Sequence, residues 1–151
     1  MESKGKQVFI STHSSYIANK LSLDNVILVN QGVVASYSEL NDDTKKYFVK
    51  LPGYDTLRFV LADKVILVEG PTDDLIIQRA YRDTYGKLPI DDGIDIIVVD
   101  SLAFKRYCDI ALLMNKSVVI VTDNDGDIKN NIHDKYKDYI NYSQFNFIYE
   151  K

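Results

Sequence analysis

The hydrophobic pattern of the chain alternates between short apolar runs and longer amphipathic stretches, most clearly after residue 63. Continuous runs of Val, Ile and Leu are typical of strands buried on both faces of a parallel sheet. Such runs predict strands at 64–69, 94–100, 118–123 and 145–149. The stretches between them predict helices at 72–85, 101–114 and 128–140. Strands that alternate with helices imply an α/β fold with a mostly parallel sheet, flanking helices and right-handed crossovers.

The first third of the chain has a less regular pattern. It predicts a short strand at 8–12, a helix at 13–21, and a hairpin with strands at 25–30 and 33–37. Further helices are expected at 41–51 and 54–63, because Pro52-Gly53 interrupts the pattern between them. We therefore expect a small α/β segment, a linker helix and a main domain, at 1–51, 52–63 and 64–151.

Acidic residues follow two of the apolar runs, where the predicted strands end. Glu69 comes directly after Val-Ile-Leu-Val, and Asp123 and Asp125 come just after Val-Val-Ile-Val-Thr. Ligand sites in parallel sheets lie at the carboxyl ends of the strands, so adjacent strands would bring these carboxylates and Asp73 into one crevice. Oxygen ligands of this kind suit Mg²⁺ or Mn²⁺. The pattern predicts a divalent-metal site, with Asp127 as a more distant member.

Most of these acidic residues also have a structural interpretation. Asp73 falls in the first turn of a predicted helix, where it could simply complement the helix dipole. The segment 123–127 could be a turn rich in Asp and Gly. A calcium EF-hand fits poorly, because Gly126 is misplaced and Asp134 stands where a bidentate Glu is needed. Glu69 is harder to explain in this way, because burying a carboxylate without a partner or metal is costly.

Other side chains with chemical potential have ordinary interpretations. Cys108 lies on the apolar face of a predicted helix and is expected in the core. His133 lies in a polar stretch and is expected to be solvated. The tyrosines Tyr136, Tyr139 and Tyr142 could stack on nucleic-acid bases, but packing of their own helix is the favoured interpretation.

Composition narrows the class of protein. The 151 residues are 46% hydrophobic and 26% charged, as in a globular domain rather than a disordered tail. The net charge of −4 argues against a self-sufficient nucleic-acid binder, which is usually basic. One cysteine excludes an internal disulfide framework and fits a reducing cytosol. No apolar run approaches the roughly 18 residues of a membrane span, so we expect a cytoplasmic protein without a membrane partner.

The acidic motifs together resemble a known domain. Val68-Glu-Gly-Pro-Thr-Asp73 and Thr122-Asp-Asn-Asp-Gly-Asp127 resemble the Toprim pattern, which has a Glu after its first strand and Asp-x-Asp after its third. Leu88-Pro-Ile and Ala103-Phe-Lys-Arg narrow the resemblance to the OLD (overcoming lysogenization defect) family of ATP-dependent endonucleases. In that family an ABC-type ATPase domain precedes a Toprim nuclease domain. The segment around His13 resembles the switch-histidine strand at the end of such an ATPase.

The resemblance implies a Toprim-like, Rossmann-like fold and a metal-dependent DNA endonuclease in which Glu69, Asp123 and Asp125 are catalytic. It also implies DNA as the substrate, a homodimer, and an accessory helicase-like protein as a further partner. His13 would sense ATP only with an ATPase body, because this chain contains no phosphate-binding loop of the Walker type. We therefore expect residues 1–51 to be the C-terminal tail of the ATPase domain, and the Toprim domain to be truncated at its C-terminus.

Two alternatives to a nuclease remain open. The chain could be a non-catalytic Mg²⁺-binding module with a regulatory or interaction role, inactive as an isolated fragment. A phosphate-transfer domain of the receiver type also uses Asp at strand ends. It fits less well, because Glu69-Gly70-Pro71 does not supply the Asp pair needed after its first strand.

Overall fold

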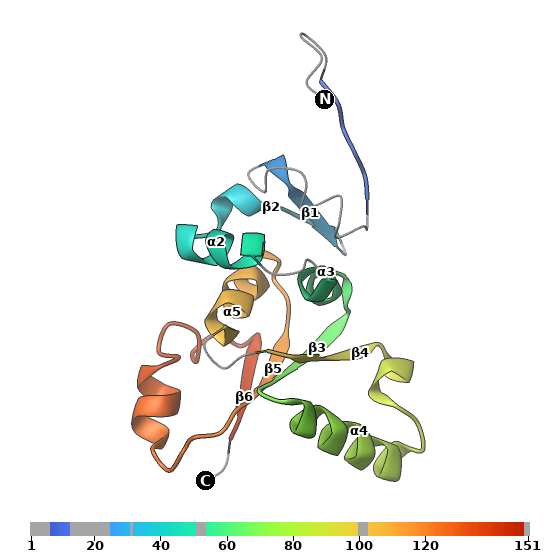
Figure 1. The fold of residues 1–151 in the computed structure, drawn as a ribbon, viewed down its shortest axis with the longest axis vertical. Helices are drawn as coiled ribbons and strands as arrows, with labels where there is room; N and C mark the ends of the chain where they lie inside the picture. Colours follow the sequence, from blue (N-terminus) through green and yellow to red (C-terminus); the bar gives the residue numbers. More distant parts are fainter. Residues whose placement is uncertain (1–6, 13–24, 31, 51–53, 100–102, 150–151) are drawn as a thin grey trace.

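A parallel sheet forms the centre of the molecule. The computed structural model describes residues 7–12, 25–30, 32–50, 54–99 and 103–149. Within these ranges the parallel strands are β3 (Lys64–Val68), β4 (Ile94–Val98), β5 (Val118–Val121) and β6 (Phe145–Ile148). Their order in the sheet is β4-β3-β5-β6 (Figure 1). This arrangement confirms the predicted α/β class and places β3 and β5 side by side.

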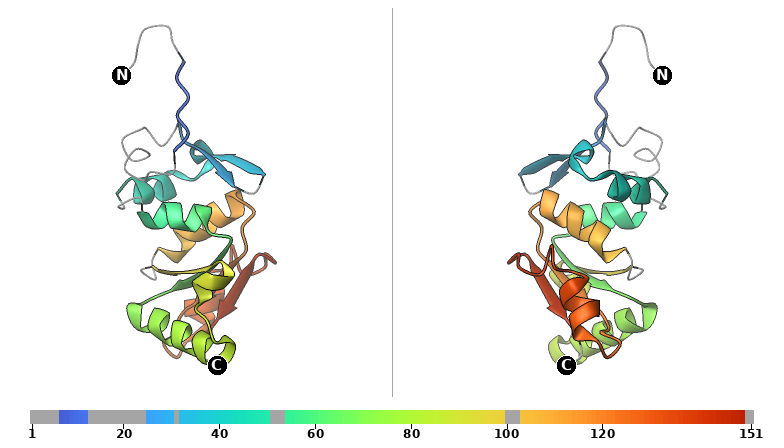
Figure 2. Two further views of the ribbon diagram at one scale, coloured as in Figure 1. Left: turned by 90° about the vertical axis from the view of Figure 1, so that its right-hand side faces the viewer. Right: turned by 90° about the vertical axis from the view of Figure 1, so that its left-hand side faces the viewer.

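Helices lie on both sides of this sheet. The chain passes from β3 through α4 (Pro71–Tyr85) and η3 (Pro89–Asp92) to β4, and from β4 through α5 (Phe104–Leu113) to β5. Figures 1 and 2 show α4 on the opposite side of the strands from α3 (Tyr54–Leu61) and α5. The end of α4 follows from the sequence, because Gly86 adopts a left-handed φ of 73° that glycine tolerates best.

The connection between β5 and β6 differs from the predicted helix at 128–140. The structure has a short π-helical turn, η4 (Lys129–Asp134), followed by turns and a bend that run to residue 144. Side chains of Asn130 and Asn131 hydrogen-bond to Asp127 and to the Asn124 carbonyl, which offers the backbone an alternative to a regular helix. The segment lies beyond β6 at the sheet edge (Figures 1 and 2).

Residues before the sheet form a smaller unit that packs on α5. The strands β1 (Ile27–Asn30) and β2 (Val33–Ser36) pair as the predicted antiparallel hairpin, followed by η2 (Tyr37–Glu39) and α2 (Asp42–Lys50). Residues 8–12 were predicted as a strand, but they form none, and Phe9 is 83% exposed. A strand needs a neighbouring strand for its backbone groups, and no strand of the described ranges forms a sheet with this segment. The predicted helix at 13–21, with His13, lies outside the described residues.

The core continues across the predicted boundary between residues 51 and 63. Phe48 on α2 and Phe59 on α3 both contact the ring of Tyr107 on α5, at 5.3 and 5.1 Å between ring centroids. Buried side chains of one cluster extend from Leu28 on β1 to Phe145 on β6. The two parts therefore share apolar packing. None of the described helices has the length and apolar character needed to cross a bilayer.

Candidate functional site

The carboxyl ends of β3 and β5 meet at one edge of the sheet. The parallel register pairs Val68 with Val121, so Glu69 and the Thr122-Asp123 dipeptide leave the sheet side by side. Oε1 of Glu69 accepts hydrogen bonds from the Thr122 hydroxyl and from the Asp123 backbone N–H, the latter at 3.3 Å. Glu69 is half-buried and Asp123 is exposed. The structure thus joins the two acidic motifs through direct contacts of Glu69.

Asp73 has a clear structural role in this conformation. It occupies the third position of α4, and its Oδ2 accepts a hydrogen bond from the Gly70 N–H at 3.0 Å. A carboxylate that reaches back in this way satisfies a free donor at the helix N-terminus. Asp74 next to it accepts a hydrogen bond from Gln78 at 2.7 Å. The helix-start interpretation therefore accounts for the observed contact of Asp73, whereas Asp74 pairs with a side chain one turn further along α4.

The loop after β5 is folded by its own side chains. Asp123 Oδ1 accepts from the Asp125 N–H at 3.1 Å, and Asn124 Oδ1 accepts from the Gly126 N–H at 2.7 Å. Asp125 and Gly126 both have left-handed backbone angles, with φ of 48° and 77°. Asp is one of the few residues other than Gly that adopts this conformation at modest cost. The loop thereby presents the exposed carboxylates Asp123 and Asp125 beyond the strand ends.

Asp127 points to the start of η4. Its two carboxylate oxygens accept from the backbone N–H and the side-chain amide of Asn130, at 3.1 and 2.6 Å. These hydrogen bonds hold the pKa of Asp127 below its usual value, because they favour the charged form. Asp127 therefore caps the turn that follows it.

The donor chemistry of the site fits a hard divalent cation, but the side chains do not converge in this conformation. Glu69, Asp123 and Asp125 offer only oxygen donors, and they come from two adjacent strand ends. Within the described ranges, however, no group of three or more His, Cys, Asp or Glu side chains is placed to hold a metal ion. Rotation of the exposed carboxylates would be needed to complete a coordination shell.

Sequence reasoning missed the buried hydroxyl of Thr122 behind the carboxylates, whereas it correctly favoured a packing role for Tyr136. Thr122 is 5% exposed and donates to Glu69. The signal for it was available, because a threonine that ends an apolar strand just before a carboxylate has its hydroxyl at the site. Tyr136 is fully buried, and its ring lies 4.9 Å from that of Phe147. This packing excludes Tyr136 as an exposed platform for bases in this conformation.

The remaining predicted side chains behave as ordinary residues. Cys108 is buried, and burial raises the pKa of its thiol, so it has the expected core role. His133 is exposed, as predicted. Tyr139 donates to Asp109 at 2.7 Å and thereby ties the segment after η4 to α5. Tyr142 is half exposed, but its ring lies edge-on to Phe145.

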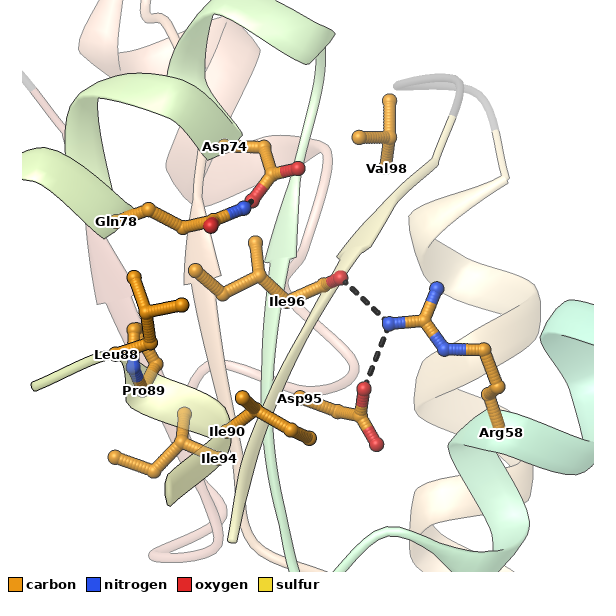
Figure 3. Close-up of a pocket in the computed structure, with 10 residues that line it drawn as sticks. All are labelled: Arg58, Asp74, Gln78, Leu88, Pro89, Ile90, Ile94, Asp95, Ile96 and Val98. Atoms are coloured by element: carbon orange, nitrogen blue, oxygen red, sulfur yellow. Dashed lines mark hydrogen bonds and ion pairs between the residues drawn. The ribbon is translucent and has the colours of Figure 1, made fainter. Parts of the chain in front are cut away.

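A pocket of about 330 Å³ lies at the β4 edge, away from these carboxylates. Arg58 closes one side of it and donates to Asp95 at 2.6 Å and to the Ile96 carbonyl at 3.1 Å (Figure 3). Asp74 and Gln78 of α4 line the opposite side (Figure 3). Glu69, Asp123 and Asp125 are absent from the lining that the described residues provide. The pocket is thus distinct from the strand-end site.

A parallel sheet with acidic motifs at two adjacent strand ends defines a Toprim-like α/β domain. The sequence model of the family described as "Overcoming lysogenization defect protein-like, TOPRIM domain" matches residues 60–125. This part of the chain is therefore a Toprim domain of the OLD-like family. The match includes Glu69, Asp73, Asp123 and Asp125, whereas Asp127 and the segment before residue 60 lie outside it. No curated protein and no solved structure matches the chain.

The family assignment indicates a class of activity. Toprim domains generally bind divalent metals, and many are metal-dependent nucleases or primases. The domain therefore indicates a module that acts on nucleic acid with the help of a divalent metal.

Proposed function

We propose that this domain binds Mg²⁺ or Mn²⁺ through Glu69, Asp123 and Asp125 and hydrolyses phosphodiester bonds in DNA. It would serve as the nuclease module of an OLD-family ATP-dependent endonuclease. The observation that supports this most directly is the contact of Glu69 with Thr122 and with the Asp123 backbone across β3 and β5. Carboxylates at the ends of paired strands keep their spacing, because the sheet hydrogen bonds fix the backbone between them.

Each residue would contribute in a different way. Glu69 is held through Oε1, so its other oxygen can serve as a ligand. Asp123 and Asp125 are exposed on the loop after β5, where a nucleic-acid phosphate can approach them. A bound cation would polarise the phosphoryl oxygen and activate the attacking water. Asp73 is held through Oδ2 by the Gly70 N–H, so it would join the ligands through its other oxygen.

A non-catalytic metal-binding module is the second candidate. One observation favours it: the net charge of the chain is −4. Phosphate contacts made by Lys and Arg supply most nonspecific affinity for DNA, so an acidic chain has little of it. In this case the domain would bind a cation and serve a regulatory or interaction role.

The first test is Mn²⁺ binding by the 151-residue chain, measured by isothermal titration calorimetry. Glu69→Gln and Asp123→Asn remove charge but keep an oxygen that can accept the observed hydrogen bonds. We expect each to weaken Mn²⁺ binding at least tenfold. Asp42→Asn is the matched control, because this exposed carboxylate lies on α2 and not at the strand ends. Binding that is absent, or equal in all variants, would refute a site at these residues.

The second test separates the two candidates. Plasmid nicking is measured with Mn²⁺ at low salt, for the wild-type chain and for Asp125→Asn. We expect slow nicking that the substitution abolishes. Carboxylate-dependent Mn²⁺ binding without any nicking would instead support the regulatory module.

A further inference from the structure

Tyr136 has an unusual hydroxyl group. The side chain is fully buried, and among the described residues the hydroxyl finds no hydrogen-bond partner of normal geometry. Buried polar groups in native proteins are nearly always hydrogen-bonded, so an exception calls for a specific explanation. The ring packs on Phe147 of β6, which directs the residue toward the sheet and not toward solvent.

The residue next to the Tyr136 hydroxyl is Thr122, which donates a hydrogen bond to Glu69. The Thr122 N–H donates to the Ile148 carbonyl at 3.1 Å, and Ile148 directly follows Phe147, on which the Tyr136 ring packs. In agreement with this placement, the Thr122 hydroxyl opposes the rise in the Tyr136 pKa that burial causes. The two hydroxyls are therefore adjacent, although their contact falls outside normal hydrogen-bond geometry. Thr122 uses its proton toward Glu69, and its oxygen can still accept a hydrogen bond. Tyr136 is the donor placed to supply one.

We propose that Tyr136 is a positioning residue for the metal site, acting through Thr122 on Glu69. A small shift would let the Tyr136 hydroxyl donate to Thr122, which fixes the threonine rotamer and keeps its proton on Oε1 of Glu69. Glu69 would then present its other oxygen to the cation without having to be reoriented. This inference rests on the proposed function, because it assigns a role to Tyr136 only if Glu69 binds metal.

The expected loss of Mn²⁺ affinity can be judged from other residues that hydrogen-bond to metal ligands. Replacing such a partner typically weakens metal binding by 10- to 100-fold. Because Tyr136 acts through one intervening side chain, we expect Tyr136→Phe to weaken Mn²⁺ binding by roughly tenfold, the lower end of that range. The substitution keeps the ring and removes only a buried hydroxyl without a hydrogen bond, so the melting temperature should stay equal or rise.

The experiment is Mn²⁺ calorimetry on the full chain, with melting temperatures measured in parallel. Thr122→Val should weaken binding, whereas Thr122→Ser keeps the hydroxyl and should restore it. Tyr136→Phe should have no further effect in the Thr122→Val background, because both changes break the same connection. Tyr142→Phe is the control, since it removes the hydroxyl of a half-exposed tyrosine.

The outcomes separate the two proposals. If the wild-type chain shows no Mn²⁺ binding that depends on Glu69, the proposed function fails. If the wild type binds but Tyr136→Phe binds equally well, the role of Tyr136 is overturned. An additive effect of Tyr136→Phe in the Thr122→Val background also overturns it, because the tyrosine would then act by another route. The positioning role is also overturned if the Tyr136→Phe chain fails to fold, because the hydroxyl would then be structural.

Discussion

Phe48 offers a direct test of whether the chain before residue 51 folds together with the Toprim sheet. It is 2% exposed on α2, and its ring lies edge-on to those of Tyr37, Tyr47 and Tyr107, at 6.3, 5.2 and 5.3 Å. The Tyr107 contact crosses from α2 to α5, and so crosses the predicted boundary. If the chain before residue 51 and the sheet form one cooperative unit, a substitution at Phe48 should therefore lower the stability of both.

The proposed change is Phe48→Leu, which keeps an apolar side chain in the site but removes the aromatic ring. Edge-to-face aromatic pairs contribute about 0.5–1.5 kcal/mol each beyond the area they bury. Truncation to Ala costs about 3–5 kcal/mol, so leucine should lose less than that. We expect a loss of about 2 kcal/mol in the free energy of unfolding, a large part of the ~5–15 kcal/mol typical of a domain.

The assay combines urea denaturation with amide hydrogen exchange. Amides of β5 (Val118–Val121) lie in the interior of the sheet and should exchange mainly through global unfolding. In Phe48→Leu their protection should fall as much as that of the α2 amides. Val34→Ala is the control, because Val34 is 68% exposed and its loss should change stability by no more than about 0.5 kcal/mol. Protection lost in α2 but unchanged in β5 would show two separately folding units and refute the reasoning.

Three further predictions concern pH, Asp127 and metal. Burial raises the pKa of Tyr37 and Tyr139 above 10.0. Above that pH the folded state retains protons that the unfolded state releases, so the free energy of unfolding should fall. The urea midpoints at pH 8 and pH 11 should differ less in Tyr37→Phe than in the wild type. Asp127→Ala should lower the melting temperature by removing a cap, yet change the Mn²⁺ dissociation constant by less than about twofold; a tenfold change would make Asp127 a ligand. Millimolar Mn²⁺ should stabilise the wild type by about 2.7 kcal/mol at a hundredfold excess over the dissociation constant, but not Glu69→Gln; equal melting shifts would argue for nonspecific binding.

The sequence predicted the sheet well, because its signals were local. Continuous Val and Ile runs identified β3 and β5, and the helix predicted at 72–85 ends where α4 ends, just before Gly86. The helix expected at 41–51 corresponds to α2, and Asn41 caps its first turn because its Oδ1 accepts from the Thr44 N–H at 2.8 Å. In each case a few neighbouring residues determine the backbone, so no knowledge of distant contacts was needed.

Errors arose where the outcome depended on competing or distant partners. The stretch at 128–140 has helical character, but Asp127 and two asparagines bond to the local backbone and to one another, and the regular helix is lost. Residues 8–12 carry the pattern of a buried strand, but Phe9 is exposed because no described strand pairs with the segment. Apolar pattern alone does not tell whether a pairing partner exists.

Sequence-based prediction of the candidate site was likewise limited, because the contacts of single side chains depend on distant partners. Sequence reasoning placed Glu69 and Asp123 at one sheet edge, because parallel strands end together. It treated Asp73 and Asp127 as members of the same cluster. In the structure Asp73 accepts from the preceding Gly70 N–H at the start of α4, and Asp127 caps the turn that follows it. A carboxylate next to a free backbone N–H has a partner without any metal, so nearness in sequence to a ligand is weak evidence for coordination. Glu69 differs, because its contacts come from the neighbouring strand end and not from its own helix. A carboxylate oriented from across the sheet is the stronger candidate ligand. The place of Tyr136 behind it, 14 residues further along the chain than Thr122, follows only from the three-dimensional structure.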